Sequence, residues 1–180
     1  YKGTCEITHY LWALVQDYGL DELKKHVKRP LTNLNVANFY GCHILMPPDV
    51  MGFENPRNPQ SMEMLAEPLG AHRVDFQQRL ACCGFHSIYP AEREALLSNG
   101  VSCLTAREAG ADCLVTPCPL CHMAIDMWQA DSQKRFDADI TMPVLHLPQL
   151  VGLALGFTPK EMAIDRHVVK AAPMLERKLT

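Results

Sequence analysis

The apolar residues near the start of the chain recur at the spacing of an amphipathic helix. They are Ile7, Tyr10, Leu11, Leu14 and Val15. Gly19 follows as a helix stop, and Asp21 is suited to cap a second, short helix that reaches Val27 before Pro30 ends it. Residues 1–34 are therefore predicted to form a helical linker segment ahead of the main domain.

Beyond residue 34, short apolar runs alternate with helical patterns. Strands are predicted at residues 36–40, 72–76, 113–116 and 142–145. Helices are predicted at residues 61–65, 90–108, 118–128 and 147–155. Such alternation is typical of a parallel sheet covered by helices, so we predict an α/β fold with a small, Rossmann-like parallel sheet over residues 35–180.

The charge balance and hydropathy exclude some classes of partner. Seventeen basic and 20 acidic residues are interspersed and give a net charge of −3, so there is no basic stripe for a nucleic-acid backbone. The most apolar stretch, residues 144–157, is interrupted by polar residues and is too short to span a bilayer. No signal sequence opens the chain, and Tyr1 in place of Met indicates a piece of a longer protein. We expect a cytoplasmic protein without a transmembrane segment.

Eight cysteines are the most specific chemical feature of the sequence. They are Cys5, Cys42, Cys82, Cys83, Cys103, Cys113, Cys118 and Cys121. Cys103 and Cys113 lie among apolar residues, where a free cysteine acts as a small buried hydrophobe, and Cys5 is interpreted as an ordinary thiol. The other five form the pattern C-x39-C-C-x34-C-x2-C, and each follows the end of a predicted strand. Because ligands bind at the carboxyl ends of the strands in open α/β sheets, these five thiols are predicted to converge on one rim.

Several chemistries use clustered cysteines. Four disulfides are disfavoured because the chain has a sizeable core and no secretory signal. A structural zinc site takes four tetrahedral ligands and leaves one thiol idle. Cys118 and Cys121 alone resemble a thioredoxin-like redox pair, which leaves the other three unexplained. An iron–sulfur cluster that departs from the simple cubane can use a fifth thiolate, so the number of thiols favours iron.

Four stretches carry a resemblance to a known family. They are Tyr40-Gly41-Cys42-His43, Ala81-Cys82-Cys83-Gly84, Ala109-Gly110-Ala111-Asp112 leading into Val115-Thr116-Pro117-Cys118-Pro119-Leu120-Cys121-His122, and Val144-Leu145-His146-Leu147-Pro148-Gln149-Leu150. With them, nearly the whole chain resembles the C-terminal cysteine-rich (CCG) domain of the B subunit of heterodisulfide reductase and its relatives. The family usually continues with small residues after Cys-Cys-Gly, whereas this chain continues with Phe85-His86-Ser87-Ile88-Tyr89.

The resemblance implies a cofactor and its ligands. By it, a noncubane [4Fe-4S] cluster is held by Cys42, Cys82, Cys83, Cys118 and Cys121. In the family this cluster cleaves a disulfide in two one-electron steps. The chain is thus expected to be an oxidoreductase subunit of a heterodisulfide reductase-like complex that acts on a small disulfide or thiol.

The resemblance also implies partners. A ferredoxin-like iron–sulfur subunit is expected to donate electrons, and a flavoprotein subunit is expected in the same complex. Partner subunits are the expected route of any association with the membrane. In the family this domain is the second half of a longer two-domain protein, to which residues 1–34 would be the linker.

Two other functions stay open at this point. One is a structural or assembly domain that holds zinc in place of a cluster. The other is an electron-relay subunit of a succinate-, fumarate- or lactate-type dehydrogenase complex, because relatives of the same domain serve in such complexes.

His43, His86 and His122 lie within three residues of a proposed ligand. Reduction of a disulfide to two thiols consumes two protons, and histidine is suited to supply them near neutral pH. His43 and His122 are the candidate catalytic residues, because the stretches that resemble the family include them. The alternative is that these side chains only donate hydrogen bonds that tune the site.

Overall fold

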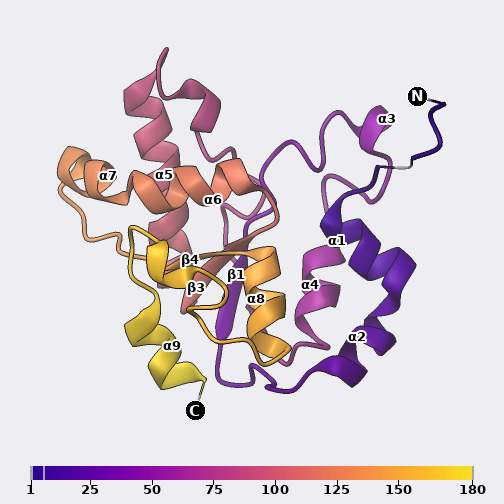
Figure 1. The fold of residues 1–180 in the computed structure, drawn as a ribbon. Coiled ribbons are helices and arrows are strands. Elements are labelled where there is room, and N and C mark those ends of the chain that lie inside the picture. The colour runs from indigo at the N-terminus through magenta and orange to yellow at the C-terminus, as the bar shows by residue number, and fades with distance from the viewer. Residues whose placement is uncertain (1, 6, 180) are drawn as a thin grey trace.

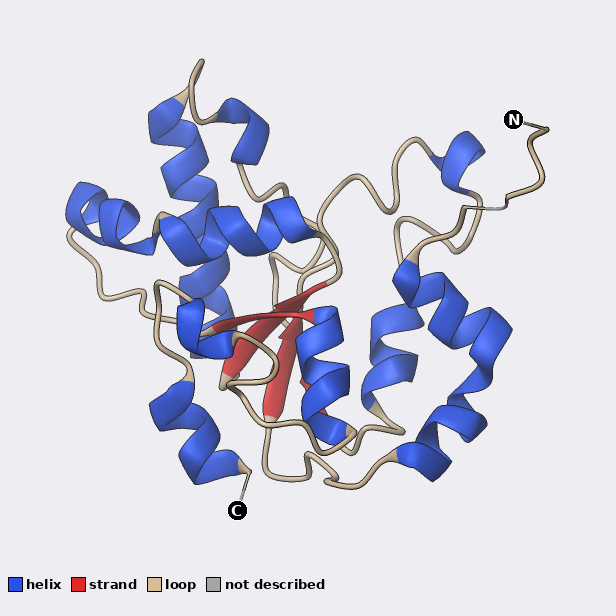
Figure 2. Ribbon diagram, viewed as in Figure 1, coloured by secondary structure: helices blue, strands red, loops and turns tan. Residues whose placement is uncertain are grey.

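A four-stranded sheet, with all strands parallel, forms the centre of the molecule (Figures 1 and 2). The computed structural model describes residues 2–5 and 7–179. The strands are β1 (Asn35–Asn38), β2 (His72–Val74), β3 (Cys113–Thr116) and β4 (Val144–His146), in the spatial order β2-β1-β3-β4. The α/β fold and the parallel sheet predicted from the alternation of elements are confirmed.

Helices and short helical turns connect the strands and cover the sheet (Figure 2). The α-helices are α1 (Tyr10–Trp12), α2 (Leu20–His26), α3 (Pro48–Met51), α4 (Ser61–Ala66), α5 (Glu92–Glu108), α6 (Pro119–Met127), α7 (Gln129–Phe136), α8 (Leu147–Ala154) and α9 (Ala172–Lys178). A π-helix, η1 (Ala13–Gly19), follows α1, and two 3₁₀ turns are η2 (Phe85–Ser87) and η3 (Ile164–Arg166). In the described ranges, none of these helices is long and apolar enough to cross a bilayer.

The central strands β1 and β3 bury side chains on both faces of the sheet, because successive residues of a strand point to opposite sides, whereas most of the edge strand β2 is exposed. Val36 of β1 and Val115 of β3 pack in the core with α1, α2, α4 and α8. Their neighbours Ala37 and Leu114 pack in a second core with α5 and α6. Two buried faces explain why β3 is a continuous apolar run in the sequence, rather than an alternation of apolar and polar residues.

The two predicted N-terminal helices form, but the first begins at Tyr10, so Ile7, predicted to lie on its apolar face, precedes the helix and is exposed. The Nδ1 of His9 accepts the N–H of Leu11 at 3.1 Å and so caps α1. Gly19, at the end of η1, has a φ of 88°, which lies outside the helical region and separates η1 from α2. The prediction that Asp21 caps the second helix is wrong, because α2 begins at Leu20 and Asp21 lies in its first turn.

Polar side chains tie α5 to the two helices that follow β3. The Nδ2 of Asn99 donates to the carbonyl of Ala124 in α6 at 2.9 Å. The hydroxyl of Ser132 in α7 donates to the carbonyl of Leu96 at 2.9 Å. Because these groups are buried, each needs such a partner, and together they fix the layer that covers this face of the sheet.

Gly84, between Cys83 and η2, lies where this turn comes close to α5. Its φ is 80°, and a Cβ there would lie 2.8 Å from both the Cα and the carbonyl oxygen of Ala95. Gly110 has a φ of 88° with nothing within 4 Å of such a Cβ, and it serves as the control. We expect Gly110→Ala to lower the free energy of unfolding by about 1–2 kcal/mol through backbone strain alone. Gly84→Ala should cost at least about 1 kcal/mol more through the clash.

Urea unfolding of the wild type and both variants measures this difference. Equal losses in the two variants would contradict the close contact between the Gly84 turn and α5.

Candidate functional site

All five cysteines of the predicted site line one cavity at the carboxyl edge of the sheet. Its walls are Cys42, His43, Cys82, Cys83, Phe85, His86, Cys118, Leu120 and Cys121. The thiols come from the loops after β1, β2 and β3, whose carboxyl ends lie side by side because the strands are parallel. The other cysteines lie elsewhere: Cys103 and Cys113 are fully buried in the core, and Cys5 is exposed in the N-terminal segment.

Two local features of the backbone bring the loops together. Gly41 has a φ of 72°, and a Cβ there would lie 2.7 Å from the Sγ of Cys121, so glycine allows the β1 loop to approach this thiol. Cys118 is the N-cap residue of α6, and Pro119 occupies its first position. Proline is favoured there because its φ is already helical and its missing N–H would have no partner. The start of α6 therefore carries both Cys118 and Cys121, and places the Cys121 thiol beside Gly41.

Hydrogen bonds between the thiols and to backbone amides control their ionisation. The Cys121 thiol, with two N–H groups in the first turn of α6, stabilises the Cys118 thiolate and lowers the pKa of Cys118 to about 5. The same thiol, with an N–H at the start of η2, lowers the pKa of Cys83 to about 7. The pKa of Cys121 is raised because its thiol proton is hydrogen-bonded to the sulfurs of Cys118 and Cys83. Burial raises the pKa of Cys42. The site therefore favours two thiolates, the form of cysteine that binds metals.

The donor set of the cavity consists of thiols supported by amides. The N–H of Gly84 also donates to the Sγ of Cys82 at 3.4 Å, so backbone donors reach sulfur from η2 as well as from α6. In the described part of the chain, no three His, Cys, Asp or Glu side chains are spaced to hold a single metal ion. Five thiols with amide donors are the chemistry that holds an iron–sulfur cluster, and the residues present fit such a group.

The two predicted catalytic histidines lie in different places. His43 borders the cavity and stacks on His86, with ring centroids 5.0 Å apart, and both side chains are exposed. His122 is not among the residues that line this cavity. Its ring lies 4.6 Å from that of His167 and 6.0 Å from that of His146, and burial lowers the pKa of His122. Of the two, only His43 has direct access to the cavity.

The residues after Cys82-Cys83-Gly84 form part of the cavity wall. The ring of Phe85 stacks on Trp128 at 6.0 Å and meets His86 edge-on at 5.3 Å, so the junction between α6 and α7 and the neighbouring residue of η2 hold it in place. In the sequence, Phe85 stands out only as a bulky residue where the family has small ones, and His86 also as a histidine close to a proposed ligand. Their position directly after the cysteine pair is the signal that could have identified them as lining residues.

A family model described as a cysteine-rich domain, CCG, matches residues 36–126. The chain belongs to the CCG cysteine-rich domain family. The matched range includes β2, β3, all of β1 but its first residue, and all five cysteines of the cavity. A CCG domain with this donor set supports the role of an iron–sulfur redox subunit.

Curated relatives of this CCG domain confirm the resemblance to the B subunit of heterodisulfide reductase. The 8-methylmenaquinol:fumarate reductase membrane anchor subunit of Wolinella succinogenes is 49% identical, covering 97% of this chain and 61% of that protein. The B subunit of the ferredoxin/F(420)H(2)-dependent CoB-CoM heterodisulfide reductase of Methanosarcina acetivorans is 36% identical, covering 98% of this chain and 59% of that protein. The chain thus spans about three fifths of these relatives, which are subunits of multi-subunit reductases.

A solved structure shares the fold. The match to the crystal structure of a hypothetical protein from Helicobacter pylori covers 84% of this chain and 28% of that protein's chain, with a TM-score of 0.65 and 18% sequence identity. At this identity the match concerns the arrangement of the sheet and helices alone.

The lowered pKa of Cys118 can be measured as a reaction rate. In the reduced, metal-free chain, alkylation of Cys118 should follow its thiolate fraction and fall as the pH drops through about 5. Cys121→Ala removes the hydrogen bond that stabilises this thiolate, so the pKa of Cys118 should rise. At about pH 6 its rate should then fall by about tenfold, because the loss of thiolate outweighs the gain in nucleophilicity.

Cys103→Ser is the matched control, because Cys103 lies fully buried in the core and burial raises its own pKa to about 12. Quantitative mass spectrometry of the alkylated peptides gives the alkylation rate of Cys118 in the wild type and in each variant. An unchanged Cys118 profile in Cys121→Ala would contradict the proposed hydrogen bond.

Proposed function

We propose that this chain is the cluster-bearing subunit of a heterodisulfide reductase-like complex. The observation that carries the proposal is the convergence of five thiols from three loops on one cavity, with two of them favoured as thiolates. The proposed ligands of a noncubane [4Fe-4S] cluster are Cys42, Cys82, Cys83, Cys118 and Cys121. A four-ligand zinc site would use only part of this set, which makes zinc the weaker alternative.

When bound, the cluster would supply one-electron chemistry for the cleavage of a disulfide. The reaction takes two electrons and two protons per disulfide and yields two thiols. The chain's own residues would prepare the site: the amides of η2 and the first turn of α6 stabilise sulfur as thiolate. Phe85, held against Trp128, would exclude water from one side of the cavity.

Protons would reach the product thiols from the open side of the cavity. His43 and its stacked neighbour His86 are exposed there, so they can exchange protons with solvent and pass them inward. His122 would act from behind Cys121, its neighbour in sequence, on the side where it packs with His146 and His167. The two electrons would come from a ferredoxin-like iron–sulfur subunit, in a complex that also contains a flavoprotein subunit.

A second function is favoured by one specific observation. The relative that is 49% identical is named as part of an 8-methylmenaquinol:fumarate reductase, whereas the heterodisulfide reductase subunit from Methanosarcina acetivorans is 36% identical. The same cysteine site would then relay single electrons between a quinol and a fumarate-reducing flavoprotein, without disulfide chemistry. Membrane association would follow from the partner subunits.

The metal content of anaerobically prepared chain tests the cofactor. We expect about four irons with acid-labile sulfide per chain, because five thiolates match a noncubane cluster. Cys42→Ser should abolish or alter the visible absorption, whereas Cys103→Ser, a change in the core, should leave it unchanged. One zinc per chain without sulfide, in protein never exposed to air, would refute the iron–sulfur proposal.

Turnover separates the two functions. If the chain reduces disulfides, a low-potential dye should drive the release of thiols from a small disulfide, and His43→Ala should slow this by about tenfold or more through loss of a proton donor. The exposed His26, paired with Glu22 in α2, gives the control variant His26→Ala. Should the dye-reduced chain leave disulfides intact but lose electrons to a fumarate reductase flavoprotein and fumarate, the relay function is the correct one.

A further inference from the structure

The side chain of Tyr40, two residues before Cys42, is fully buried, and its hydroxyl has two partners. It donates a hydrogen bond to a carboxylate oxygen of Glu63 in α4 and accepts the N–H of Met62 at 2.9 Å. Glu63 is itself only 8% exposed. A carboxylate buried to this degree destabilises the fold unless it is paired, so its partners hold it in one place.

Arg79, three residues before Cys82, is the cation that completes this network. Its Nη2 lies 3.7 Å from the Oε1 of Glu63 and donates to the carbonyl of Pro59. Its guanidinium stands over the ring of Tyr40, 5.6 Å from the ring centroid. The N–H of Tyr40 donates to the carbonyl of Arg79 at 3.0 Å, so the two residues meet through backbone as well as side chains.

These contacts join the loop that carries Cys42 to the loop that carries Cys82 and Cys83. The ladder between β1 and β2 has ended before Tyr40 and before Arg79, so strand pairing does not set the distance between the two loops at this point. The buried network does so instead. Because Tyr40 is followed directly by Gly41, which packs on the Cys121 thiol, a shift of Tyr40 would also disturb the loop after β3.

We propose that Glu63 is a positioning residue of the cysteine site, which holds Cys42 and the Cys82–Cys83 pair at the separation that a bound cluster requires. The inference rests on the proposed iron–sulfur function. Glu63 acts on the thiols through Tyr40 and Arg79, and its place in α4, far in sequence from every cysteine of the site, gives no sign of this role.

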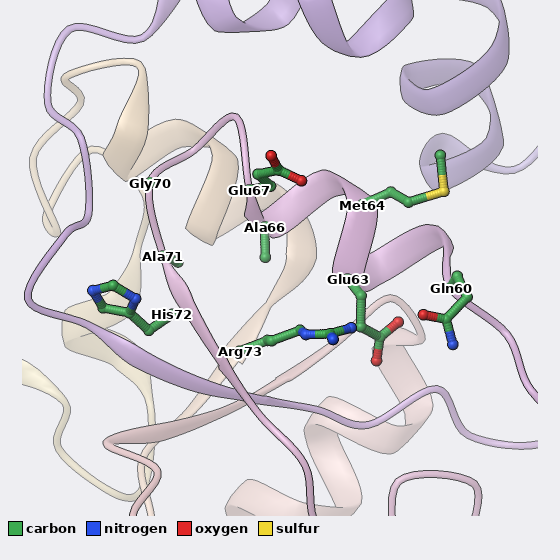
Figure 3. Close-up of a pocket in the computed structure, with 9 residues that line it drawn as sticks. All are labelled: Gln60, Glu63, Met64, Ala66, Glu67, Gly70, Ala71, His72 and Arg73. Atoms are coloured by element: carbon green, nitrogen blue, oxygen red, sulfur yellow. The ribbon is translucent and has the colours of Figure 1, made fainter.

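Glu63 also borders a pocket of about 590 Å³ between α4 and β2. Figure 3 shows Glu63 and Glu67 on the helix side of this pocket and His72 and Arg73 on the strand side. Glu67 lies one helical turn after Glu63 and is exposed. The same substitution at Glu67 therefore changes the charge of the same pocket without touching the buried network.

The reactivity of Cys83 in the reduced, metal-free chain reports the position of its loop. Cys83 is 4% exposed, so an alkylating reagent reaches it only when the loop opens, whereas Cys103 in the core reports global unfolding. Glu63→Leu leaves the buried phenol of Tyr40 without its acceptor and the guanidinium of Arg79 without its counter-ion. At about pH 8 we expect alkylation of Cys83 to accelerate by about tenfold or more, the effect of one unpaired buried polar group, with Cys103 unchanged.

Conservative variants keep the test decisive if Glu63→Leu does not fold. Glu63→Gln retains an oxygen that accepts from Tyr40, so the Cys83 rate should stay within about threefold of wild type. Tyr40→Phe keeps the ring and removes only the hydroxyl, so it should accelerate Cys83 more than Glu63→Gln does. Glu67→Leu should leave the rate at the wild-type value.

After anaerobic reconstitution with iron and sulfide, Tyr40→Phe should also change the electron paramagnetic resonance line shape of the cluster, while Glu67→Leu should not.

A Cys83 alkylation rate that stays unchanged in the folded Glu63 and Tyr40 variants would overturn the proposal. A parallel rise of the Cys83 and Cys103 alkylation rates would overturn it as well, because it would show that Glu63 only stabilises the fold as a whole. If wild-type chain takes up no cluster, the iron–sulfur function fails on its own, and the thiol rates still decide whether Glu63 positions the loops.

Discussion

β1 and β3 pair in parallel, with Asn38 opposite Val115, and the position of the thiols depends on this register. It places the loop of Cys42 next to the first turn of α6, where Cys118 and Cys121 lie. A slip by one residue would turn the strand side chains to the opposite faces and separate the loops. The alternating burial of Val36 and Ala37 in two different cores specifies the register and thus protects the site.

Thiolates gathered in a partly buried cavity repel one another, and the structure offsets this repulsion mainly with hydrogen-bond donors. Cys121 contributes its proton to two neighbours, and amides of α6 and η2 supply the rest. This arrangement explains why neighbouring thiols differ so much in pKa although they share one cavity. The same loops are also held by the buried network of Glu63, Tyr40 and Arg79. In our proposal, the charged groups of this network fix the backbone of the loops and do not contact sulfur.

The relatives show one domain in two kinds of reductase. Subunits of a fumarate reductase and of a heterodisulfide reductase align over nearly all of this chain, at 49% and 36% identity. The aligned part takes in the sheet and its carboxyl edge, and one fold can support different reactions. In this chain, Phe85 and His86 form part of the wall of the cavity, beside the five thiols.

The sequence by itself determined the strands, the parallel sheet and the grouping of five cysteines, because these depend on local periodicity and on the rule that parallel strands share a carboxyl edge. The sequence was also sufficient to identify the family, through the specific spacing of these five cysteines. The tertiary structure decided which side chains meet. His122 follows Cys121 yet packs with His146 and His167, because neighbours on a helix point in different directions. Glu63 meets Tyr40 and Arg79 only through the packing of α4 on the sheet, a long-range contact that no local pattern in the sequence records.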